Sequence, residues 1–289
     1  MREHILVFHF DENLINRLHN KRVVVITSDF EKVHHICKSV NDRQNSLHCI
    51  VIQHKGTLAS IPFHESWRGI PLAIFVNEMG PFKEMMGKLP VLRNLSARIF
   101  LSTANNANFT NLHILASLGI DCGVSFDENI VDWEAMNDLM TYAVYSKVNH
   151  ASVEPFQFIA QSYDPSRFTE FSSVYFDNPQ TYLYVDKDEN IALNSKDLKQ
   201  GKFIAKGFDA LPAICENVKF TESIHAWQEF FLKENGCAYC QAWRVCLGKF
   251  SATYDKNPGC RQFFVDLMEA SDHFRALQQK NKRKELWQP

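Results

Sequence analysis

The sequence predicts an α/β fold in which a partial (β/α) barrel-like parallel sheet precedes a C-terminal domain with a β-hairpin and a four-cysteine metal site. Short apolar runs alternate with helical patterns over the first half of the chain, an alternating apolar and polar stretch follows, and half of the cysteines lie close together near the end. Repeated strand–helix–strand units imply parallel strands joined by crossover helices. An open doubly wound sheet fits the same spacing, so the sequence leaves both arrangements possible.

Six short runs rich in Val, Ile and Phe are predicted to be buried strands, because polar residues bound each of them and strands of a parallel sheet are apolar on both faces. They are His4–Phe10, Arg22–Ile26, Leu47–Ile52, Pro71–Val76, Ala97–Leu101 and Ile120–Phe126.

Helix signals lie between several of these runs. Ser28 and Glu31 have the spacing of a capping box, which predicts a helix through about Lys38. A helix is also expected over 108–118, where Gly119 suits the left-handed position after a helix end. A further helical pattern follows Asp132.

The pattern changes after about residue 165, and we expect three segments: an α/β domain over 1–165, a linker over 166–180 and a C-terminal domain over 181–289. Tyr182–Leu193 alternates apolar and polar residues on both sides of a polar centre, which predicts a β-hairpin. An amphipathic helix is expected before Asn235-Gly236, and a last helix with an apolar stripe is expected after Cys260.

Composition excludes several classes of protein. The chain of 289 residues is 45% hydrophobic with a net charge of -2, which argues against a nucleic-acid binder with a broadly basic surface. The one dense basic run, Lys280–Lys284, is interpreted as a solvated helix end. No segment approaches the ~20 apolar residues of a membrane span, and the first residues do not resemble a signal peptide. We therefore expect a cytoplasmic protein without nucleic-acid or membrane partners.

Four cysteines form the strongest functional signal. Cys237, Cys240, Cys246 and Cys260 read C-x2-C-x5-C-x13-C. Thiolates are soft metal ligands, and their grouping in a chain without a secretory signal favours metal over disulfides. A single C-x2-C pair with two separate further cysteines favours a [4Fe–4S] cluster, whereas structural zinc sites commonly use two such pairs. Zinc and redox-active thiols remain alternatives.

The order "YVDKDENIALN", "WQEFFLKENGCAYCQAWRVCLG" and a last cysteine resembles the SPASM domain of radical SAM peptide-modifying enzymes. That family binds two auxiliary [4Fe–4S] clusters through a first cysteine, Gly-x4-Cys, C-x2-C-x5-C-x3-C and a final cysteine. The resemblance implies that the four cysteines here retain the ligands of the second cluster. The positions that correspond to ligands of the first cluster hold Asn194, Lys206 and Phe250 instead.

The C-x3-C-x2-C triplet that holds the catalytic cluster of radical SAM enzymes is absent from the sequence. The chain therefore resembles a degenerate, pseudo-radical-SAM protein of the kind associated with peptide maturases in Bacteroidales. This resemblance implies a non-catalytic accessory that binds a precursor peptide, a radical SAM maturase or both, without S-adenosylmethionine. An iron–sulfur electron-transfer partner, a structural zinc protein and an independent enzyme are the alternatives.

Other residues with chemical potential carry weaker signals. His34, His35 and Cys37 are neighbours on an expected helix and do not share one face. Cys49 and Cys122 lie in expected strands and are interpreted as small buried apolar residues. Asp127 and Glu128 follow an expected strand at the edge where α/β proteins bind ligands, so they are candidates for an independent active site. The segment Thr103–Asn108 follows another expected strand at such an edge and is a candidate either for hydrogen bonds to a peptide backbone or for a helix N-cap loop.

Overall fold

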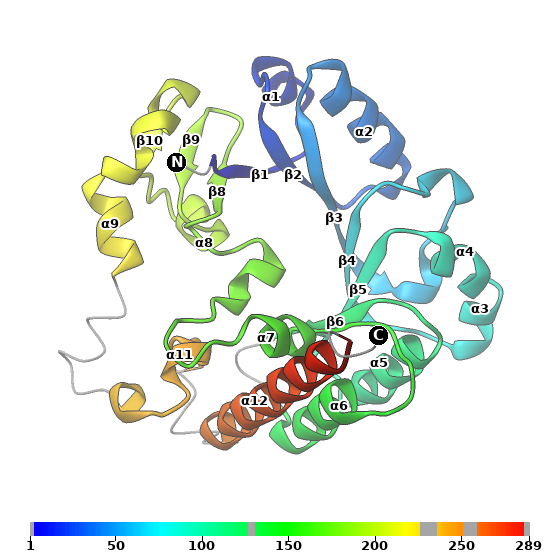
Figure 1. Cartoon of the computed structure of the whole chain (residues 1–289). Coiled ribbons are helices and arrows are strands. Elements are labelled where there is room, and N and C mark those ends of the chain that lie inside the picture. The colour runs from blue at the N-terminus through cyan, green and yellow to red at the C-terminus, as the bar shows by residue number, and fades with distance from the viewer. Residues whose placement is uncertain (1–2, 127–130, 226–235, 251–258, 286–289) are drawn as a thin grey trace. The chain divides into compact units, whose positions relative to one another are not determined.

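The computed structural model describes residues 3–126, 131–225, 236–250 and 259–285 (Figure 1). Its strands are β1 Ile5–His9, β2 Arg22–Thr27, β3 Ser46–Thr57, β4 Leu72–Glu78, β5 Ala97–Ser102, β6 Cys122–Ser125, β7 Val153–Glu154, β8 Tyr182–Val185, β9 Asn190–Ala192 and β10 Ala205–Lys206. The first six coincide with the six predicted runs, so those predictions are confirmed. The strands form one sheet in a mixed α/β fold.

The described helices are α1 Glu12–Arg17, α2 Val33–Asp42, α3 Phe82–Met86, α4 Leu89–Asn94, α5 Ala107–Ser117, α6 Trp133–Tyr145, α7 Phe156–Ser162, α8 Ser195–Lys199, α9 Val218–Ile224, α11 Trp243–Cys246 and α12 Gly259–Glu285. Short 3-10 helices are η1 Phe30–Lys32, η2 Leu58–Ser60, η3 Glu65–Trp67, η4 Phe171–Tyr175, η5 Phe208–Glu216 and η6 Gly236–Tyr239. The helix expected before Asn235 falls mostly on residues outside the described part of the chain.

Strand order distinguishes the two windings that the sequence left possible. The sheet runs β10-β9-β8-β1-β2-β3-β4-β5-β6-β7. From β1 to β7 the order follows the chain without the reversal that defines a doubly wound sheet, so the winding is the consecutive one of (β/α) barrels. The order of the described strands has two ends, β10 and β7, and is therefore not closed into a ring.

Most of the sheet is parallel, as predicted. β1 pairs with β2 in parallel, with Leu6 opposite Val23, and β2–β3, β3–β4 and β6–β7 are parallel as well. Val23, Val24 and Val25 are at most 1% exposed, because strands of a parallel sheet are covered on both faces.

The predicted hairpin is confirmed, but its place in the sheet was not foreseen. β8 and β9 are antiparallel, with Tyr184 opposite Ala192. β8 also pairs in parallel with β1, with Ile5 opposite Tyr182. The hairpin thus extends the N-terminal sheet instead of opening a separate C-terminal domain.

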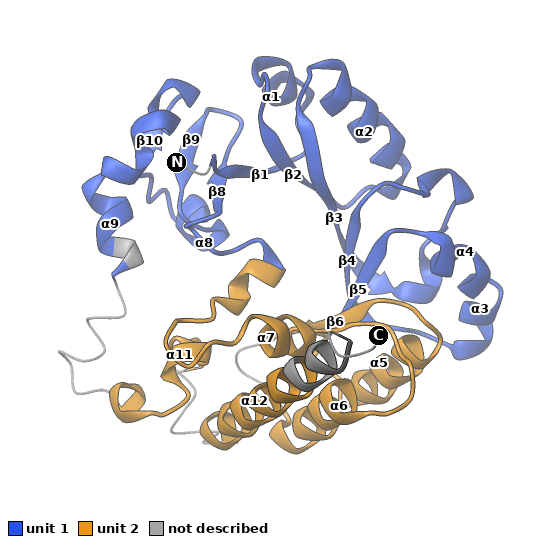
Figure 2. Ribbon diagram, in the orientation of Figure 1, with its two compact units in different colours: residues 1–100, 175–228 blue, residues 101–174, 229–289 orange. Residues whose placement is uncertain are grey.

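The chain divides into two compact units, each made of two segments (Figure 2). Unit 1 contains 1–100 and 175–228, and unit 2 contains 101–174 and 229–289. This division differs from the consecutive one expected at 1–165, 166–180 and 181–289. The expected linker 166–180 includes η4, in which Phe171 and Val174 are buried. The hairpin and the four cysteines belong to different units.

Individual capping residues explain where several helices begin or end. Asp132 caps α6, its Oδ1 accepting the Ala135 N–H at 3.0 Å, as expected from the sequence. Gly119 follows α5 with a φ of 78°, which also confirms the expected stop. The predicted Ser28–Glu31 capping box is wrong: the Asp29 carboxylate accepts the Glu31 N–H at 3.0 Å and begins η1. A carboxylate two residues before that N–H closes this tight turn.

None of the helices in the described ranges is long and apolar enough to cross a membrane.

Candidate metal centre

Two short helices and the first turn of a long helix in unit 2 carry three of the four cysteines, and Cys240 lies between the two short helices. Cys237 lies in η6, Cys246 ends α11, and Cys260 is in the first turn of α12. The Cys240 N–H donates to the Cys237 carbonyl at 3.1 Å, and the Trp243 N–H donates to the Cys240 carbonyl at 3.1 Å. These consecutive turns bring the two cysteines of the C-x2-C pair close to the start of α11.

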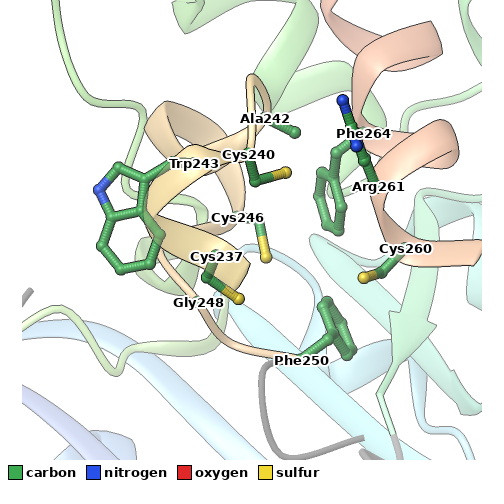
Figure 3. A pocket seen from close by; sticks show the side chains of 10 residues that line it. All are labelled: Cys237, Cys240, Ala242, Trp243, Cys246, Gly248, Phe250, Cys260, Arg261 and Phe264. Atoms are coloured by element: carbon green, nitrogen blue, oxygen red, sulfur yellow. The ribbon is translucent and has the colours of Figure 1, made fainter. Parts of the chain in front are cut away.

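The four cysteines line one cavity of about 340 Å³, counting the part open to solvent (Figure 3). Figure 3 shows the sulfur of Cys260, on the α12 side, directed toward the side occupied by the other three cysteines. The spacing in the sequence therefore predicted correctly which cysteines lie together. Cys37, Cys49 and Cys122 do not line this cavity.

Among the described residues, no group of three or more His, Cys, Asp or Glu side chains is placed to hold one metal ion. A tetrahedral zinc with bonds of about 2.3 Å to sulfur needs its sulfurs about 3.8 Å apart. A cluster has its irons at several corners, so its ligand sulfurs lie further apart. Four thiols that line one cavity are a donor set that structural zinc sites and iron–sulfur clusters both use.

Burial favours the protonated thiol at Cys237, Cys246 and Cys260, because it raises the pKa of each. It raises the pKa of Cys246 to about 12 and the pKa of Cys260 to about 11. Burial also raises the pKa of Cys237, with a further contribution from the neighbouring Cys240. Metal ligands must be thiolates, so metal binding at neutral pH releases these protons.

Backbone N–H groups oppose this effect at Cys246. Hydrogen bonds from the N–H groups of Phe250, Gly248 and Lys249 lower its pKa, although burial outweighs them. The chain turns back on itself there, with left-handed φ angles of 50° at Leu247 and 74° at Gly248. Successive N–H groups directed at one sulfur form a concave anion site. This turn therefore prepares Cys246 to act as a thiolate ligand, and such hydrogen bonds also tune cluster potentials.

An aromatic cluster that includes Phe250 and Phe264 forms one wall of the cavity. Phe250 is 2% exposed, and its ring centroid lies 5.2 Å from that of Phe126 and 5.1 Å from that of Trp133. Phe264, one turn after Cys260, packs against Phe250 with centroids 5.8 Å apart. The apolar stripe predicted on the last helix is thus core at Phe264. Aromatic rings that exclude water on this side lower the polarity around the sulfurs.

A glycine beside Cys260 allows two helices to meet. A Cβ atom on Gly259 would lie 2.5 Å from Cδ1 of Trp133, the first residue of α6. Only a residue without a side chain fits this approach, and it places the Cys260 turn directly against the aromatic cluster. Sequence reasoning missed this contact, although the glycine before Cys260 was visible.

The weaker sequence candidates do not assemble into a second site in the described residues. His34 and His35 are exposed, and His35 bonds the Glu12 carboxylate. Cys49 and Cys122 are buried, as expected. Burial also raises the pKa of Cys49 to about 12, which makes it a poor nucleophile.

Of the candidate residues that follow strands, Thr103–Asn108 lie within the described part of the chain and Asp127 and Glu128 do not. Thr103 and Asn108 are buried and make hydrogen bonds within the chain. The Asn108 amide donates to the Ser102 carbonyl at 2.8 Å, and the Thr103 N–H donates to the Ser125 carbonyl at 3.0 Å.

In comparisons with known proteins, no family model, no curated protein and no solved structure matches the chain.

Proposed function

We propose that Cys237, Cys240, Cys246 and Cys260 hold one [4Fe–4S] cluster, in a non-catalytic accessory protein of a cytoplasmic ribosomal peptide modification system. Its partner is a precursor peptide, a radical SAM maturase or both. The observation that supports the proposal is the single cavity that all four cysteines line. The N–H groups directed at Cys246 add a second reason, because they stabilise a thiolate ligand.

The residues that replace the ligands of the SPASM family's first cluster support a degenerate role. Asn194 caps α8, its side chain accepting the Asp197 N–H at 2.8 Å. Lys206 lies in β10, and Phe250 is buried in the aromatic cluster. Each of these positions serves packing or secondary structure in this chain. One cluster per chain, and none bound by these positions, is the corresponding expectation.

A bound cluster supplies folding free energy and, where its potential allows, one-electron chemistry. The chain's own contribution is to bury the sulfurs against Phe250 and Phe264 and to donate N–H groups to Cys246. Both features rigidify the C-terminal segment, which is the role expected of a scaffold that presents a binding surface.

Electron transfer is a second candidate because one of the four cysteines also lines a second, solvent-open groove. Cys240 lines the cavity and a neighbouring groove that is open to solvent. A ligand at the surface shortens the path to a redox partner. Reversible reduction of the cluster by dithionite, followed by its oxidation by the maturase, would favour this role over a scaffold.

Anaerobic purification followed by iron, sulfide and zinc analysis tests the proposal. We expect about four irons and four sulfides per chain, with broad visible absorption that bleaches on reduction. One zinc without sulfide would establish a structural zinc module and remove the cluster. A metal-free protein with all four thiols reactive would remove both.

A further inference from the structure

A solvent-open groove in unit 2 lies next to the cysteine cavity and shares Cys240 and Trp243 with it. Its volume open to water-sized molecules is about 520 Å³. Ligand sites commonly measure ~300–1,000 Å³, so the groove is large enough for several side chains of a ligand.

Its walls are largely apolar. Tyr163, Phe168 and Met268 contribute side chains to them, and the Phe168 ring is 51% exposed. Tyr239, between two lining residues in the chain, is 76% exposed. Large exposed rings gathered around a concavity are typical of binding surfaces, because they gain free energy when a partner covers them.

The charge of the groove selects its ligand. Of the described residues that line it, Arg244 is the one charged residue, and none is a carboxylate. The Arg244 guanidinium has five N–H donors, of which one donates to the Pro165 carbonyl. A guanidinium on an apolar wall binds a carboxylate by charge-assisted hydrogen bonds.

Charges just outside the lining do not reverse this preference. Arg275 donates to the Tyr163 carbonyl at 3.2 Å. Asp164 accepts the N–H and hydroxyl of Ser166 at 2.9 and 2.7 Å, and Arg167 lies 3.8 Å from it. Burial and the charge of Asp272 raise the pKa of Tyr163, whereas the charges of Arg244 and Arg275 lower it.

The size of the lining favours a peptide over a folded partner. Nine of the described residues line the groove. A stable interface between folded proteins uses ~20–30 residues on each side, whereas an extended segment of a few residues is satisfied by one groove.

We infer that this groove binds an acidic segment of the precursor peptide, with a carboxylate on Arg244 and a neighbouring apolar side chain against Phe168 and Met268. The identity of the peptide rests on the proposed function, whereas the preference for an acidic apolar segment rests on the groove itself. Bound peptide would lie beside Cys240, and therefore beside the metal ligands.

Fluorescence polarisation with three labelled synthetic peptides tests the inference on the full chain. The first has adjacent Glu and Phe residues in a Gly-Ser context, the second has Lys in place of Glu, and the third has Ser in place of Phe. We expect the first to bind at least about tenfold more tightly than either of the others, about 1.4 kcal/mol per decade. Equal binding of the Glu and Lys peptides, or no binding of any, overturns the inference.

Two variants locate the binding. Arg244→Gln and Phe168→Ser should each weaken binding of the Glu-Phe peptide about tenfold or more, whereas Arg167→Gln, with a side chain 82% exposed outside the groove, should leave it within twofold. Because Phe168 is half exposed, its replacement keeps the test valid if Arg244→Gln does not fold. Unchanged binding in Phe168→Ser contradicts the site.

Iron content measured on the same samples separates this inference from the proposed function. Selective peptide binding by a protein that contains no iron would support the groove and contradict the proposed cluster. Normal iron with no selective binding removes the groove alone. Sedimentation provides a last outcome: self-association that Phe168→Ser abolishes would make the groove a contact between two copies of the chain and overturn the peptide assignment.

Discussion

The sheet core of unit 1 and the cysteine segment of unit 2 are stabilised by different means. In unit 1, strands such as Val23–Val25 bury aliphatic side chains almost completely and form backbone ladders with distant segments. In unit 2, Cys237 and Cys246 lie on η6 and α11, which have four residues each. Helices that short are unstable alone, since nucleation is not offset by propagation. The cysteine segment therefore depends on tertiary contacts and on whatever its thiols bind.

The comparison teaches where a metal would matter. Binding energy at a site that is absent from the unfolded chain is folding energy for the region around it. That region is 236–250 with the first turns of α12, where the aromatic cluster supplies the remaining contacts. Unit 1 has its own sheet core, so loss of the metal should be felt in unit 2 and hardly in unit 1.

The largest expected effect is that of Cys246→Ala. Removing a ligand should reduce metal affinity by more than the ~10–100-fold that a change beside a ligand costs, so the purified variant should carry little metal. Hydrogen exchange should become rapid in 236–250 while β1–β4 keep their protection. Metal analysis and hydrogen-exchange mass spectrometry on one preparation check both results.

The matched control is Cys49→Ala, a buried cysteine of β3 in unit 1. It should leave the metal content unchanged and alter exchange in the sheet instead. Full metal retention in Cys246→Ala would show that Cys246 is not a ligand. Faster hydrogen exchange throughout β1–β4 in the same Cys246→Ala variant would show that the two units are not independent.

A smaller effect is expected from Gly259→Ala. The new Cβ would meet Trp133 atoms at 2.5 to 2.8 Å, so the indole or the start of α12 must shift. Overpacking of this kind typically costs ~1–3 kcal/mol of stability. The Cys260 turn moves with α12, so metal content should also fall. Thermal denaturation with metal analysis measures both.

Gly87→Ala is the control for this substitution. Its Cβ would have no heavy atom within 4 Å, and its φ of -68° suits any residue. It should change stability by no more than about 0.5 kcal/mol. Trp133→Leu in the Gly259→Ala background should recover part of the metal content by making room. A Gly259→Ala variant as stable and as metal-rich as the parent would show that the close approach has no consequence for the site.

The sequence predicted local features and missed those that depend on distant segments. The six strands were predictable because each contains a short, continuous apolar run, such as the one within Arg22–Ile26. The pairing of Tyr182 with Ile5 was not, because no local pattern tells an added hairpin which strand it will join. That pairing also moved the hairpin out of the unit that holds the cysteines.

The candidate site divides in the same way. Sequence spacing identified the four cysteines that line one cavity. The Gly259–Trp133 contact and the groove were missed because their residues come from segments more than 70 positions apart, such as Phe168 and Arg244. What a groove can bind depends on such long-range packing, and composition alone does not reveal it.

The smallest expected effect concerns acid and again separates the units. Burial lowers the pKa of His4, His9 and His48 in unit 1 below the ordinary value of 6.5, whereas His113 is the corresponding case among described histidines of unit 2. Between the lowered folded pKa and 6.5, the unfolded chain binds more protons than the folded chain. Stability from these groups is therefore complete above pH 6.5 and is lost as the pH falls below it.

Denaturant unfolding of the full chain at pH 7.5 and pH 5.5, followed by hydrogen exchange, measures this loss in each unit. We expect unit 1 to weaken more than unit 2 over this interval, because three of its histidines resist protonation against one in unit 2. His48→Asn should reduce the pH dependence of unit 1 without changing that of unit 2. Equal weakening of both units, or a dependence unaffected by His48→Asn, would assign the acid sensitivity to groups other than these histidines.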